Sequence, residues 1–95
     1  MTRVTLKKDE NRYSVICEGH AVGSCEVCAA VSTLVYTLLG YLKNADDVVV
    51  EKSELADGYA EIEFSGGERA RVAFGMVSIG FLQLERANKN FIEIF

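Results

Sequence analysis

Hydrophobic and polar residues alternate in three short segments of the chain. Thr2 to Lys7 and Tyr13 to Glu18 show this period of two near the start. Tyr59 to Phe64 repeats it after a turn that contains Asp57-Gly58, and the valine-rich segment Asp47 to Ser53 before that turn is also expected to be a strand. Alternation is typical of strands with one buried and one solvated face. We therefore predict two β-hairpins.

Two longer segments repeat their apolar residues at helical spacing. The first spans Val27 to Leu42, and Ser24 just before it is a suitable N-cap. The second spans Glu68 to about Lys89. It contains Gly75 and Gly80, for which we expect a packing role because glycine costs about 1 kcal/mol relative to alanine inside a helix.

Phe91 to Phe95 adds a possible short strand at the end of the chain. The order β-β-α-β-β-α then predicts a two-layer α+β fold, with both helices on one face of a mainly antiparallel sheet. At 95 residues, with 49% hydrophobic residues and no proline, we expect a single domain over residues 1–95 with a modest core.

The net charge and the lengths of the apolar segments limit which binding partners and which cellular location we expect. A net charge of −4 argues against a surface for nucleic-acid phosphates. The acidic residues of strands and turns, including Asp57, are expected on solvated faces. Val27 to Leu42 is shorter than the roughly 20 residues that cross a bilayer, and no apolar signal-peptide segment follows Met1. We expect a cytoplasmic protein with no membrane partner.

The only histidine and two of the three cysteines fall between Gly19 and Ser32. Without an export signal, free thiols in a reducing cytosol are expected rather than disulfides. Cys28 should lie in the first turn of the helix, where the positive end of the helix dipole favours a thiolate. His20 is close enough in sequence to act as its base. Amides of the turn from Gly19 to Gly23, or of the helix start, are candidate oxyanion donors.

Gly19-His20-Ala21, followed by Val27-Cys28-Ala29-Ala30-Val31-Ser32, resembles the signature of the ribosomal-processing cysteine protease (Prp) family. The resemblance implies a catalytic dyad of His20 and Cys28, with Ser32 in a supporting role. A hydroxyl that bonds back to its own helix is the alternative for Ser32. The resemblance also implies a homodimer that removes the N-terminal extension of a large-subunit ribosomal protein. No cofactor or metal is expected.

Two departures from the family pattern affect the proposed site. The loop between His20 and Cys28 is shorter than is usual in the family, and Cys25 stands where the family has an aspartate three residues before the cysteine. Glu26, next to that position, is a candidate to orient His20, although a first-turn glutamate also suits the helix dipole. The short loop leads us to expect that the dyad is held apart until substrate orders the turn.

Three other interpretations use the same residues. Cys25 and Cys28 form a C-x-x-C at a helix start, the placement of a redox pair. Cys17, His20, Cys25 and Cys28 imitate a four-ligand zinc set, although the gap between the two pairs is short for such a site. A non-catalytic ribosome-associated binding module that keeps the fold is the alternative to an enzyme, and a cleavage assay distinguishes the two.

Overall fold

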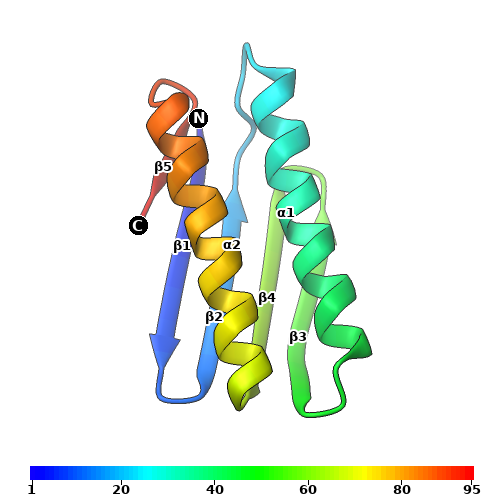
Figure 1. Ribbon diagram of the computed structural model, residues 1–95. Helices are drawn as coiled ribbons and strands as arrows, with labels where there is room; N and C mark the ends of the chain where they lie inside the picture. Colours follow the sequence, from blue (N-terminus) through cyan, green and yellow to red (C-terminus); the bar gives the residue numbers. More distant parts are fainter.

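The computed structural model describes all 95 residues and has the predicted order of elements (Figure 1). The elements are β1 (Thr2–Asp9), β2 (Arg12–Glu18), α1 (Cys25–Asn44), β3 (Val48–Ala56), β4 (Tyr59–Gly66), α2 (Glu68–Ala87) and β5 (Ile92–Ile94). Every predicted strand and helix is present, and the ends differ from the predicted ends by at most a few residues.

The five strands form one sheet in the order β3-β4-β2-β1-β5. The three pairs among β1 to β4 are antiparallel, whereas β5 adds to β1 in parallel. Both helices cover the same face of this sheet (Figure 1). The predicted α+β architecture is therefore confirmed. The neighbouring position of β2 and β4, which joins the two hairpins into one sheet, did not follow from the local pattern.

The core lies between the helices and the covered face of the sheet. Tyr13, Val15 and Cys17 alternate as the buried residues of β2, as their pattern predicts. The buried residues of α1 are Val27, Val31, Val35, Leu38, Leu39 and Leu42. By length and composition alone α1 could cross a membrane. All six of these side chains belong to the core cluster that includes the strands, so α1 is a core helix.

The two glycines inside α2 lie in different surroundings. A Cβ on Gly80 would lie 2.8 Å from Leu34 Cδ2 of α1, so the missing side chain lets the two helices approach each other. A Cβ on Gly75 would meet nothing within 4 Å. The expected packing role is therefore confirmed for Gly80, and it is wrong for Gly75.

Candidate active site

The loop from β2 to α1 determines where the helix starts and thereby where Cys28 lies. Gly19 and Gly23 adopt φ values of +85° and +93°, a region that side chains disfavour and glycine accepts. Ser24 is the predicted N-cap, and its Oγ accepts a hydrogen bond from the Val27 amide at 3.3 Å. The loop and the cap together place Cys28 in the first turn of α1, as predicted.

The Cys28 thiol faces the loop that precedes its helix. The Ala21 amide donates to Cys28 Sγ at 3.3 Å, and the sulfur lies 4.0 Å from the Ala21 carbonyl oxygen. The sulfur thus lies next to a backbone donor and near the amino-terminal end of α1. Ala21 is thus the residue of the predicted turn whose amide reaches the nucleophile candidate.

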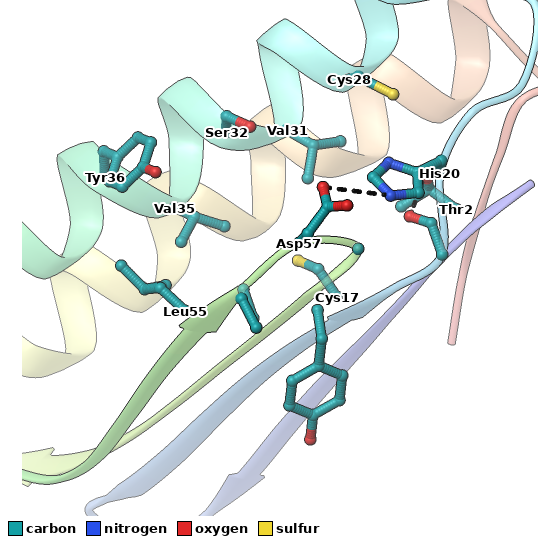
Figure 2. Close-up of a pocket in the computed structure, with 15 residues that line it drawn as sticks. Thr2, Cys17, His20, Cys28, Val31, Ser32, Val35, Tyr36, Leu55 and Asp57 are labelled. Atoms are coloured by element: carbon teal, nitrogen blue, oxygen red, sulfur yellow. Dashed lines mark hydrogen bonds and ion pairs between the residues drawn. The ribbon is translucent and has the colours of Figure 1, made fainter.

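His20 lies in the loop two residues after the end of β2, and its side chain is 54% exposed. Its Nε2 atom lies 3.5 Å from Asp57 Oδ1, the contact drawn as a dashed line in Figure 2. The hydrogen-bond partner of the Cys28 sulfur is the backbone of Ala21 rather than the imidazole. The two residues of the predicted dyad therefore share one site without a direct hydrogen bond. This agrees with the expectation that the short loop holds His20 and Cys28 apart in the free protein.

His20, Cys28 and Ser32 line the same cavity, which has a volume of about 420 Å³ and lies between α1 and the β3–β4 hairpin (Figure 2). Nine of its 15 lining residues are hydrophobic, Val35 and Leu55 among them, so the cavity that holds the thiol can also receive apolar groups. Ser32 lies one turn after Cys28, on the cavity side of α1. The adjacent hydroxyl, that of Thr33, is the one that donates back to its own helix, at Ala29.

Only one of the other predicted supporting residues lies at the cavity. Gly19 lines the cavity, whereas Gly23, Cys25 and Glu26 are not among its lining residues. Glu26 is exposed in the first turn of α1, where it suits the helix dipole. The carboxylate that contacts His20 belongs to Asp57, which the sequence pattern placed only on a solvated turn.

The structure does not assemble the four-ligand zinc set. Cys17 is buried, Cys25 is exposed and Cys28 is half-buried, and all three are free thiols. No group of three or more His, Cys, Asp or Glu side chains is placed to hold a metal ion. The zinc interpretation therefore has no geometric support.

Two residues that line the cavity have raised pKa values. Burial raises the pKa of the Cys17 thiol to about 12, so this thiol is neutral near pH 7. A hydrogen bond from Tyr59 Oη to Glu61 Oε1, 2.6 Å long, is the main cause that raises the pKa of Tyr59 to about 12. Because a thiolate is the reactive form of cysteine, Cys17 is a poor nucleophile although it lines the same cavity as Cys28.

Known structures share this fold over almost the whole chain. The ribosomal processing protease Prp from S. aureus, in complex with a covalently linked product peptide, superposes with a TM-score of 0.84 at 18% identity, covering 99% of this chain and 97% of that chain. The same protease with a substrate peptide gives 0.80 at 18% identity, covering 100% and 98%. SMU.848 from Streptococcus mutans gives 0.77 at 24% identity, covering 99% and 95%.

These identities are low, so the superpositions show a shared fold. No curated protein matches the chain. The model of the family described as "Cysteine protease Prp" matches residues 1–93, which is nearly the full length. The structure independently places the histidine and the cysteine of the family signature at one cavity. The chain therefore belongs to the cysteine protease Prp family.

Proposed function

We propose that the protein is a cytoplasmic cysteine endopeptidase that removes the N-terminal extension of a large-subunit ribosomal protein. The observation that carries the proposal is the Cys28 thiol at the start of α1, with the Ala21 amide on its sulfur and His20 at the same cavity. Membership of a cysteine protease family supports the reaction class. The peptide complexes of the S. aureus protease support a peptide as the ligand.

In the proposed reaction His20 accepts the Cys28 proton, and the thiolate attacks the carbonyl carbon of the scissile bond. The imidazolium then protonates the leaving amine, and a thioester to Cys28 remains. Water, deprotonated by His20, hydrolyses this thioester and restores the thiol. The Ala21 amide faces the sulfur in the free protein, and it is the proposed donor to the carbonyl oxygen as that oxygen gains charge.

The cavity and the charge of the protein support the proposed substrate. Val31, Val35 and Leu55 line the same cavity as the thiol, so apolar side chains of an extension can be buried there. The net charge of −4 favours the approach of a basic ribosomal protein.

We further propose that the protein is a homodimer, formed through the outward face of α2. Val72, Met76 and Ile79 recur at i, i+4 and i+7, and these residues are 44%, 71% and 57% exposed. Apolar residues grouped in this way on one helix face mark an interaction surface. A second copy fits because a two-fold axis pairs the same stripe with itself and buries both.

The cleavage assay incubates each purified variant with the extended ribosomal protein under reducing conditions, followed by mass spectrometry of the products. The wild type should release the extension. Cys28→Ala should release none but should still bind the substrate, because alanine is favourable in a helix and the fold persists. His20→Ala should fall by about 10² to 10⁴-fold, the usual contribution of general acid-base help. Cys17→Ser and Cys25→Ser should keep substantial activity.

Two results would contradict the proposal. If the wild type binds the extended ribosomal protein and leaves it uncut, the molecule is a binding module that shares the protease fold. If Cys28→Ala cuts as well as the wild type does, the nucleophile lies elsewhere. Circular dichroism and thermal unfolding of each variant show whether a loss of activity comes from a loss of fold.

A further inference from the structure

The turn between β3 and β4 lies beside His20 because of the pairing between β2 and β4. Continued past its last pair, the register of this antiparallel ladder sets Gly19 opposite Gly58 and His20 opposite Asp57. The Gly19 amide donates to the Gly58 carbonyl at 2.8 Å, so the backbone contact does extend beyond the strands. The turn is therefore attached to the segment that carries the histidine.

Both residues of the turn contact the imidazole. Asp57 Oδ1 lies 3.5 Å from His20 Nε2. Gly58 adopts a φ of +74°, and a Cβ at this position would lie 2.9 Å from the same nitrogen. The ring thus lies directly on the backbone of Gly58. In Figure 2 the imidazole lies beside the Asp57 carboxylate, with Nε2 on the side of Asp57, and the Cys28 sulfur lies on another side of the ring.

We propose that Asp57 is a positioning residue for His20, with Gly58 as the surface on which the ring rests; this inference depends on the proposed protease function. A carboxylate beside Nε2 favours the tautomer with its proton on that nitrogen, and it leaves Nδ1 free to accept the proton of the thiol. Asp57 thereby supplies the acidic group that the family pattern has three residues before the cysteine, where this chain has Cys25.

The exposure of Asp57 and His20 to water determines when the contact between them affects catalysis. In the free protein the side chain of Asp57 is 98% exposed and that of His20 is 54% exposed, so water weakens their attraction. A peptide in the cavity covers the imidazole and removes water from around it, which strengthens the same contact. The contribution of Asp57 is therefore expected in kcat, and only weakly in substrate binding.

Because the chain has one histidine, nitrogen NMR reads the tautomer of His20 without assignment ambiguity. The neutral imidazole of the wild type should hold its proton mainly on Nε2, and Asp57→Ala should reduce this share. Asp57→Asn should restore part of it, because the amide oxygen can also accept from Nε2–H. Asp46→Ala is the matched control, since it removes an exposed carboxylate from the turn between α1 and β3.

Cleavage kinetics provide the second measurement. Asp57→Ala should lower kcat by about 10- to 100-fold, as expected for the loss of a charge-assisted contact that forms fully only in the covered site, with KM within about twofold of the wild type. Asp57→Asn should recover much of kcat, and Asp46→Ala should match the wild type. Gly58→Ala should also lower kcat because its methyl group displaces the ring, whereas Gly40→Ala, whose methyl group meets nothing within 4 Å, should not.

The outcomes separate this inference from the proposed function. The proposed protease function holds if the wild type cuts the substrate and Cys28→Ala does not. If, in that case, Asp57→Ala and Asp46→Ala have the same kcat and the same tautomer ratio, the positioning role of Asp57 is wrong. If the wild type does not cut, the proposed function is wrong. In that case, if the tautomer ratio of His20 is the same in Asp57→Ala as in the wild type, the proposal that Asp57 orients His20 is also wrong.

Discussion

Replacing Cys17 with alanine should remove a pH-dependent part of the folding stability. Cys17 is 5% exposed, and burial raises the pKa of its thiol from 9.0 to about 12. Above pH 9 the thiol ionises in the unfolded chain but stays protonated in the folded protein. The contribution of the neutral Cys17 thiol to the free energy of unfolding is therefore fully present below pH 9 and is lost as the pH rises towards 12.

The size of the effect follows from the window between the two pKa values. The loss approaches about 1.4 kcal/mol for each pH unit above 9, so at pH 10 it is on the order of 1 kcal/mol relative to pH 8. A change of this size lowers the Tm of a domain of this length by about 4 to 8 °C. The alanine also leaves a small cavity, but the cost of that cavity does not depend on pH.

Urea unfolding at pH 8 and pH 10 under reducing conditions measures the effect for the wild type, Cys17→Ala and Cys25→Ala. The free energy of unfolding of the wild type should fall relative to that of Cys17→Ala by about 1 kcal/mol over this interval. Cys25→Ala should follow the wild type, because Cys25 is exposed. An identical pH dependence in the wild type and Cys17→Ala would refute the assignment of a buried, neutral thiol at this position.

Gly75→Ala should stabilise the protein by about 0.4 to 1 kcal/mol, because space is open around it and alanine restricts the unfolded chain. Gly80→Ala should be neutral or destabilising, since its methyl group meets Leu34 at 2.8 Å and overpacking costs about 1 to 3 kcal/mol; equal stabilisation of both variants in thermal unfolding would contradict the close helix contact. Met76→Asp should convert the proposed dimer to a monomer in light scattering after size-exclusion chromatography, whereas Val49→Asp, an exposed apolar position on β3, should leave it dimeric. A monomeric wild type or a dimeric Met76→Asp would count against the α2 interface.

The sequence by itself determined the elements and the identity of the central residues. Alternation and helical spacing depend only on which residues must face a core, so the alternating pattern from Tyr13 to Glu18 correctly predicts a strand with one buried face. His20 and Cys28 could be found because one short segment carries both, and chain connectivity keeps them close. The cap at Ser24 is equally local, since it depends on a hydroxyl and an amide three residues apart.

The tertiary structure decided which distant residues complete the site. Asp57 and Gly58 meet His20 only because β4 pairs with β2, and nothing in the local pattern of either strand specifies that neighbour or its register. Glu26 was the nearer acidic candidate in sequence, but its helix position keeps it exposed and outside the cavity. The different surroundings of Gly75 and Gly80 likewise depend on how α2 packs on α1. Strand order and helix packing depend on how the apolar surfaces of all the elements are buried together. Contacts that depend on them can therefore be identified only in the complete fold.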